Sequence, residues 1–98
     1  MSMTREAILD CLRQNRERIR TEFHAEVVGL FGSYSRGDER EDSDVDVLVE
    51  FDDEANFLHL TRLGFFLEDL LHLKVDIASQ KALRPRMASV VARELIAL

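Results

Sequence analysis

Two pairs of residues in this sequence have the types and spacing that phosphate chemistry needs. Gly32 and Ser33 form a Gly-Ser step, and Asp44 and Asp46 follow further along the chain. A glycine lets a phosphate approach the backbone closely, and carboxylates at positions i and i+2 of a strand point to the same face. Together these residues predict a metal-dependent phosphoryl-transfer site.

The two aspartates alternate with valines, which predicts a strand with both carboxylates on the face opposite Val45 and Val47. Like charges this close raise each other's pKa unless a cation lies between them. Oxygen ligands with no His or Cys beside them favour Mg²⁺, or Mn²⁺, over Zn²⁺. Taken alone, an Asp-x-Asp step is also typical of a turn or a capping pair.

A third carboxylate, Asp76, lies between Val75 and Ile77 in another β-prone run. Alternation in a strand places Asp76 on the face opposite both neighbours. Because two-metal sites usually need a further carboxylate, we interpret Asp76 as the third metal ligand. It is also our candidate for the group that takes the proton from an attacking hydroxyl. The alternative is an ordinary surface residue.

The elements that must position these side chains follow from the periodicity of apolar residues. Helical spacing predicts helices over residues 4–22 and 56–73 and a last helix from Pro85, and Thr4 suits the first N-cap. β-prone runs predict strands over residues 27–31, 44–51 and 74–78, and a helical turn is expected over residues 34–37. The predicted fold class is α/β, a small mixed sheet with flanking helices, in a single domain over residues 1–98.

Several other residues have an ordinary structural interpretation. Cys11 suits a small core position, Tyr34 a packing position and Gly64 a close-packing site inside a helix. The three histidines, His24, His59 and His72, are not spaced as a set of metal ligands.

Charge and composition exclude other classes of protein. The net charge is -6, and residues 38–54 hold ten acids and one base. Because affinity for nucleic acid comes mostly from Lys and Arg, nucleic acid is not expected as a direct substrate. No window approaches the roughly 18 uncharged apolar residues of a membrane span, and the N-terminus lacks the apolar region of a signal peptide. We therefore expect a soluble cytoplasmic protein without a membrane partner.

The motif from Gly32 to Gly37, followed by Ser43 to Asp46, resembles that of the DNA polymerase beta nucleotidyltransferase superfamily, and the chain's length resembles its minimal nucleotidyltransferases. The resemblance implies a polymerase-beta-like core in which Gly32 and Ser33 bind the triphosphate. It implies that Asp44, Asp46 and Asp76 bind two Mg²⁺ ions and are catalytic. Arg36 occupies the family's arginine position and would face phosphate; its alternative is an ion pair with the acidic turn.

The same resemblance implies transfer of AMP from ATP to a hydroxyl, with release of pyrophosphate. The usual companion of the minimal family is a HEPN-domain toxin, which the small protein inactivates, as antitoxin, by AMPylating a tyrosine. Exposed apolar side chains would suit such a partner, and we expect them on the 56–73 helix at Phe57, Leu58, Phe65 and Phe66. The alternative is that the chain itself covers them.

Two other functions stay open at this point. A nucleotidyltransferase could act on a small molecule such as an aminoglycoside, although that usually requires an added substrate-binding domain. A non-catalytic antitoxin could instead neutralise its partner by contact and keep the nucleotide site as a vestige.

Overall fold

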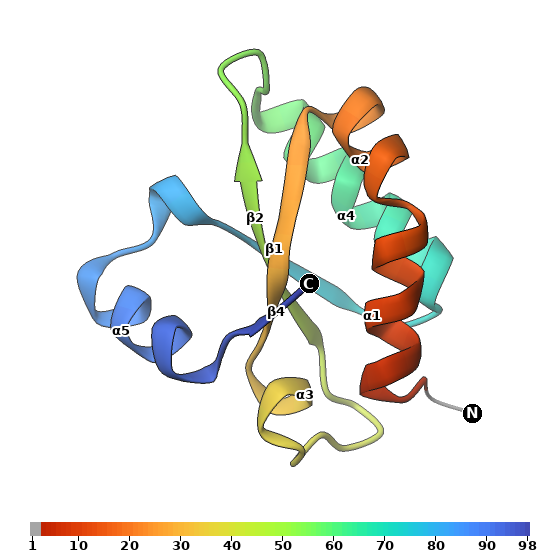
Figure 1. Cartoon of the computed structure of the whole chain (residues 1–98), viewed down its shortest axis with the longest axis vertical. Coiled ribbons are helices and arrows are strands. Elements are labelled where there is room, and N and C mark those ends of the chain that lie inside the picture. The colour runs from red at the N-terminus through yellow and green to blue at the C-terminus, as the bar shows by residue number, and fades with distance from the viewer. Residues whose placement is uncertain (1–2) are drawn as a thin grey trace.

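The computed structural model describes residues 3–98 as helices on both sides of one small sheet (Figure 1). The predicted alternation of helices and strands is present. In chain order, the elements are α1 (Arg5–Gln14), α2 (Arg16–Phe23), β1 (Ala25–Phe31), α3 (Ser33–Arg36), β2 (Val45–Phe51), α4 (Phe57–Leu71), β3 (Val75–Ser79), the 3₁₀ helix η1 (Gln80–Ala82), α5 (Pro85–Glu94) and β4 (Ile96–Ala97).

The sheet is mixed, with the strand order β3-β2-β1-β4. Strand β1 pairs antiparallel with β2 and β4, whereas β2 and β3 are parallel. Parallel neighbours need a crossover connection, and α4 provides it. The predicted fold class, a small mixed sheet with flanking helices, is confirmed.

The two faces of the sheet are covered differently. Helices α1, α2 and α4 lie together on one face, and α5 lies on the other (Figure 1). The larger core lies under the three helices and contains fully buried side chains such as Ile8, Leu30, Val47 and Leu63. A smaller cluster of Phe31, Leu48 and Val91 lies under α5. No helix within residues 3–98 is long and apolar enough to span a membrane.

The first predicted helix is wrong in one respect, because residues 4–22 form two helices that meet at Asn15. The Asn15 side chain donates a hydrogen bond of 2.8 Å to the Cys11 carbonyl oxygen, so it competes with the backbone for the end of α1. Thr4 is the N-cap, as predicted, and its hydroxyl accepts from the Ala7 N–H at 3.1 Å. Cys11 is partly buried and packs against the core.

The C-terminal residues were the least predictable part of the fold. Helix α5 begins at Pro85, as predicted, but ends at Glu94, and β4 and η1 were not predicted. Strand β4 pairs with β1 through Gly29 and Leu30. A Cβ on Gly29 would overlap the Ile96 carbonyl oxygen, so a glycine in β1 is what lets β4 approach.

Candidate active site

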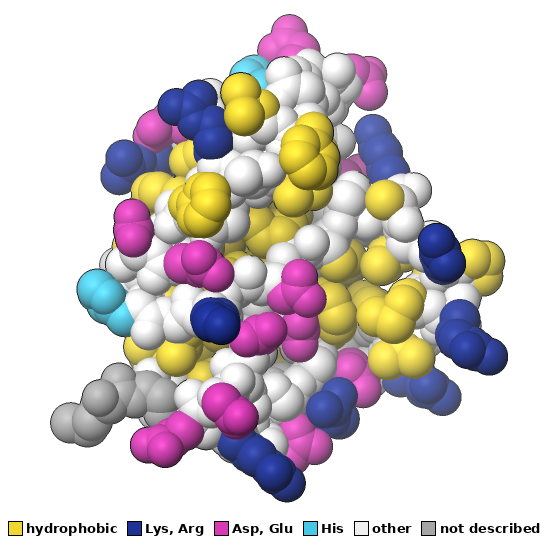
Figure 2. Space-filling model, turned by 180° about the vertical axis from the view of Figure 1, so that it is seen from behind, with side chains coloured by type: hydrophobic (Ala, Val, Ile, Leu, Met, Phe, Trp, Pro, Cys, Tyr) yellow, Lys and Arg dark blue, Asp and Glu magenta, His cyan; other side chains and the backbone are white. Residues whose placement is uncertain are grey.

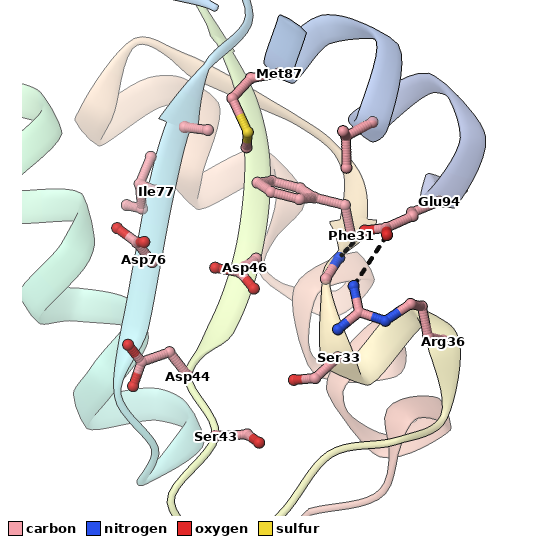
Figure 3. Close-up of a pocket in the computed structure, with 13 residues that line it drawn as sticks. Phe31, Ser33, Arg36, Ser43, Asp44, Asp46, Asp76, Ile77, Met87 and Glu94 are labelled. Atoms are coloured by element: carbon pink, nitrogen blue, oxygen red, sulfur yellow. Dashed lines mark hydrogen bonds and ion pairs between the residues drawn. The ribbon is translucent and has the colours of Figure 1, made fainter.

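The six predicted site residues line one pocket of about 540 Å³ between the sheet and α5 (Figure 3). They come from the β1–α3 turn, from α3, from the residue just before β2, and from the adjacent strands β2 and β3. The six are Gly32, Ser33, Arg36, Asp44, Asp46 and Asp76. The structure therefore brings all of them together, although their roles stay a prediction.

The register of β2 and β3 explains why the carboxylates meet. Asp46 lies directly opposite Asp76 in the parallel pairing, so both side chains project from the same face of the sheet. Asp44 lies one residue before β2 and also lines the pocket. Figure 3 shows the three carboxylates in one region of the pocket. The predicted position of Asp76, opposite its neighbours Val75 and Ile77, is confirmed by this register.

The electrostatics of this cluster favour a bound cation. Burial, together with the charges of Asp76 and Asp44, raises the pKa of Asp46 to about 6. Within residues 3–98, none of the three carboxylates accepts a side-chain hydrogen bond or forms an ion pair. Ionised carboxylates only accept hydrogen bonds, and their oxygens are the ligands that hard divalent cations prefer. Three carboxylates without a protein partner therefore suit a cation such as Mg²⁺.

The carboxylates are not closed around a common point. In the part of the chain that the structure describes, the only His, Cys, Asp or Glu group with ligand atoms all within 4.8 Å of one another is His24, Asp52 and Glu54. A wider spacing of Asp44, Asp46 and Asp76 is what like charges should adopt without a cation between them. The chemistry of the donor set, three carboxylates with no His or Cys, fits a hard divalent cation.

Gly32 has a conformation that other residues rarely adopt. Its φ is +77° and its ψ is -153°, a region essentially restricted to glycine. A Cβ on Gly32 would also overlap Asp46 Oδ2. The glycine therefore serves both the turn that ends β1 and the close approach of this turn to the carboxylates.

Ser33 and Tyr34 follow in the short helix α3 with different environments. The Ser33 hydroxyl faces the pocket (Figure 3). Tyr34 is 1% exposed and belongs to the larger core, so the packing interpretation is confirmed. Gly37 ends α3 with a φ of +81°.

Arg36 takes part in two ion pairs. Its Nε lies 3.1 Å from Asp38 Oδ2, which is the predicted pair with the acidic turn, and its Nη1 lies 2.9 Å from Glu94 Oε2. Arg36 still lines the pocket, so it is positioned beside any phosphate bound there. A role in phosphate binding stays a prediction.

Glu94 is the functional candidate that the sequence analysis missed. At the end of α5, its Oε1 accepts from the Gly32 N–H at 3.0 Å while its Oε2 pairs with Arg36. Its carbonyl oxygen also accepts from the Ser35 hydroxyl. Glu94 therefore ties the end of α5 to the Gly-Ser turn. No sequence signal could have found it, because the contact joins segments far apart in the chain.

Two of the three histidines, His24 and His59, are neighbours in the fold. The rings of His24 and His59 lie 5.0 Å apart, and His24 Nδ1 lies 3.2 Å from Asp52 Oδ2 and 3.5 Å from Glu54 Oε2. These residues are scattered in the sequence but adjacent in the fold. They lie away from the pocket, whose lining contains none of them.

Residues 12–98 match the family model of the nucleotidyltransferase domain. The chain therefore belongs to the nucleotidyltransferase domain family, and the resemblance seen in the motif is confirmed. The members of this family are nucleotidyltransferases, which agrees with the phosphoryl-transfer chemistry predicted for the site.

A curated relative matches nearly the whole chain. The protein adenylyltransferase MntA of Thermococcus cleftensis is 38% identical over 94 residues, which cover 96% of this chain and 95% of the relative. A solved structure provisionally described as a minimal nucleotidyltransferase is 43% identical, with a TM-score of 0.74, over 92% of this chain and 95% of that one.

Two toxin–antitoxin structures share the fold at lower identity. One, with AMP-PNP, has a TM-score of 0.71 and 23% identity over 97% of this chain and 72% of that chain. The other is the tri-AMPylated HEPN toxin of Shewanella oneidensis in complex with its MNT antitoxin, with a TM-score of 0.61 and 22% identity over 95% of this chain and 66% of that chain.

Proposed function

We propose that this chain acts as one nucleotidyltransferase domain that moves AMP from ATP to a tyrosine hydroxyl of a partner HEPN-domain toxin and so serves as its antitoxin. The observation that carries the proposal is the meeting of Asp44, Asp46 and Asp76 with the Gly32–Ser33 turn in one pocket. The adenylyltransferase name of the Thermococcus relative supports the reaction. The tri-AMPylated toxin in a complex of the same fold supports the partner.

The phosphate side of the reaction belongs to the Gly-Ser turn. Gly32 lets the triphosphate lie against the backbone, and the Ser33 hydroxyl donates a hydrogen bond to it. Arg36 offers a guanidinium beside the same pocket, which offsets the charge of the leaving pyrophosphate. These groups hold ATP with its α-phosphorus toward the carboxylates.

The hydroxyl side belongs to β2 and β3. Asp76 lies exposed on the edge strand and takes the proton from the incoming hydroxyl. Asp44, Asp46 and Asp76 would hold two Mg²⁺ ions, which supply charge neutralisation and a lower pKa of the attacking hydroxyl. Most of the remaining acceleration comes from positioning the hydroxyl in line with the leaving group.

The test is transfer to the partner protein. We would incubate the chain with its HEPN partner, Mg²⁺ and ATP, and measure nucleotidyl addition by intact mass. The Asp44→Asn, Asp46→Asn double variant should lower the rate by at least about a thousandfold, since it removes two of the three carboxylates. The matched control is Asp52→Asn, Asp53→Asn, which changes exposed acids outside the pocket and should react at the normal rate.

The non-catalytic alternative makes the opposite prediction. If the chain neutralises its partner by contact, no mass is added, and the Asp44→Asn, Asp46→Asn variant still suppresses the toxin. That pair of results would overturn the transferase proposal. Transfer to an aminoglycoside but not to the partner would favour the small-molecule alternative.

A further inference from the structure

A second groove meets the active-site pocket at β3. It has a volume of about 220 Å³ and lies between α4 and the free edge of β3, which is the outermost strand of the sheet. Asp76 and Ile77 line both this groove and the active-site pocket. A side chain in the groove can therefore reach Asp76 from the side opposite the Gly-Ser turn.

Gly64 lies in the wall of this groove, in the middle of α4. The close-packing interpretation of this glycine is wrong. A Cβ at this position would meet only Ile77 Cδ1, at the ordinary contact distance of 3.8 Å. A glycine inside a helix costs about 1 kcal/mol of stability relative to alanine. No close contact at this position requires a glycine. What the glycine does provide is width between α4 and β3.

The groove is lined by apolar and polar side chains in about equal measure, and its two acidic groups differ in whether they already accept a hydrogen bond. Phe65, which is 64% exposed, stands beside Leu60 and Ile77. Glu68 is already engaged, because its carboxylate accepts from the Val75 N–H at 3.1 Å. Asp76 has no such partner among residues 3–98 and is the free acceptor of the groove.

Other side chains next to the groove extend the apolar surface. Phe57 and Leu58, at the start of α4, are 80% and 61% exposed, whereas Phe66 packs against Phe23 with ring centroids 5.1 Å apart. Of the four apolar residues considered for a partner, three are therefore uncovered and Phe66 is covered by the chain. Figure 2 shows hydrophobic side chains beside a group of acidic ones on this side of the molecule.

We infer that the groove between α4 and β3 is the acceptor subsite, which receives a tyrosine side chain of the partner protein and presents its hydroxyl to Asp76. The inference rests on the proposed function and adds where the acceptor binds. An aromatic ring suits the apolar side chains of the groove and the room left by Gly64, and a phenol places one polar atom at the Asp76 end. A serine or threonine side chain would leave most of the groove unfilled.

The chemical step balances without any further reactant. The phenolic oxygen forms a bond to the α-phosphorus of ATP, and the bond from that phosphorus to the bridging oxygen of pyrophosphate breaks. The phenolic proton passes to the Asp76 carboxylate. The products are the tyrosyl-AMP phosphodiester on the partner and pyrophosphate.

The experiment narrows the groove and measures the acceptor and the nucleotide separately. Gly64→Leu should raise the KM for the HEPN partner and lower kcat/KM by at least about tenfold, since leucine fills the space beside Ile77. The rise in thermal midpoint caused by ATP and Mg²⁺ should be the same as for the unaltered chain, since Gly64 does not line the nucleotide pocket. The matched control is Asp69→Leu, which adds the same side chain to an exposed position of α4 outside the groove. It should react normally.

Each outcome decides a different point. A Gly64→Leu variant that transfers AMP within twofold of the normal rate overturns the acceptor subsite while leaving the proposed function intact. Failure of the unaltered chain to modify its partner instead overturns the proposed function. If Gly64→Leu loses its response to ATP, Gly64→Ala decides, because its Cβ fits at ordinary contact distance. That variant should raise the KM for the partner about threefold, and an unchanged KM overturns the subsite.

Discussion

The two faces of β2 have opposite environments. On one face, Val45, Val47 and Val49 are fully buried under α1, α2 and α4. On the other face, Asp44 and Asp46 open into the pocket below α5. The strand thus separates a side that stabilises the fold from a side that offers charge to a ligand, and neighbouring residues differ in environment only because side chains alternate.

The difference shows how a small chain places repelling charges next to each other. The apolar face supplies the free energy of folding, and the carboxylate face costs part of it, as the raised pKa of Asp46 indicates. Functional sites commonly carry such a cost, because charges arranged for a ligand are poorly arranged without it. The comparison predicts that mutations on the two faces change different properties.

The largest effect on stability is expected in the larger core, between the sheet and helices α1, α2 and α4. Leu63→Ala in α4 should lower the free energy of unfolding by about 2–5 kcal/mol, because Leu63 is fully buried and its truncation leaves a cavity. Urea denaturation would measure the loss. AMP transfer per folded molecule should be nearly unchanged. Arg62→Ala, the exposed neighbour, serves as control and should cost less than about 0.5 kcal/mol.

Gly32→Ala tests the close approach of the Gly-Ser turn to Asp46, on the carboxylate face of β2. The variant should destabilise the chain by about 1–3 kcal/mol because of the positive φ, and it should lower AMP transfer by more than tenfold because the new Cβ displaces Asp46. Thermal unfolding and the transfer rate would be measured together. Gly37→Ala also introduces a side chain at positive φ, but nothing lies within 4 Å of its Cβ, so it should lose stability without a comparable loss of transfer.

Glu94→Ala tests whether the contacts of Glu94 on the pocket side of the sheet stabilise the fold. The substitution removes the acceptor of the Gly32 N–H and one partner of Arg36. A lost charge-assisted hydrogen bond to a partly buried donor should cost about 1–2 kcal/mol in the free energy of unfolding. Chemical denaturation would show it. Equal stability of the variant would mean that α5 is held by its apolar contacts alone.

The smallest effect is a gain of stability with a pH dependence. The pKa of Asp46 in the folded chain is about 6, above its ordinary value of 3.8, so the folded state binds this proton more tightly than the unfolded state. The contribution of Asp46 to stability is therefore greatest below about pH 4 and is lost as the pH rises through about 6.

Without divalent metal, Asp46→Asn should accordingly be more stable than the unaltered chain at pH 7.5, by about 1 kcal/mol after allowance for partial solvent exposure. The difference should vanish near pH 4. Thermal unfolding in EDTA across this pH range would measure it. A variant that is less stable than the unaltered chain at pH 7.5 would contradict the idea that the carboxylate face costs folding energy.

Much of the site was predictable because its parts are local. Asp44 and Asp46 are separated by one residue, and alternation alone predicts that they lie on one face; in the structure both line the same pocket. Gly32 could be singled out because a glycine at the end of a β-prone run predicts a turn. The same local patterns predicted three of the strands and the start of α5 to within two residues.

The errors arose where a side-chain hydrogen bond or a long-range contact overrode the pattern of apolar residues. The apolar spacing of residues 4–22 continues through Asn15, but the Asn15 side chain ends α1 through its bond to Cys11. Strand β4 has two residues, too few for a periodic pattern, and it exists because Gly29 accepts it against β1. The Glu94 contacts and the His24–Asp52 pair likewise join distant segments.

The sequence by itself determined the alternating faces of the strands, the Gly-Ser turn and the aspartates that belong to a nucleotidyltransferase, because these depend on neighbours in the chain. The tertiary structure decided which strands pair, and so set Asp76 opposite Asp46. It also joined Glu94 to the turn and opened the groove beside Gly64 next to Asp76. The physical reason is that these features depend on strand register and helix packing, which bring together residues that no local pattern relates.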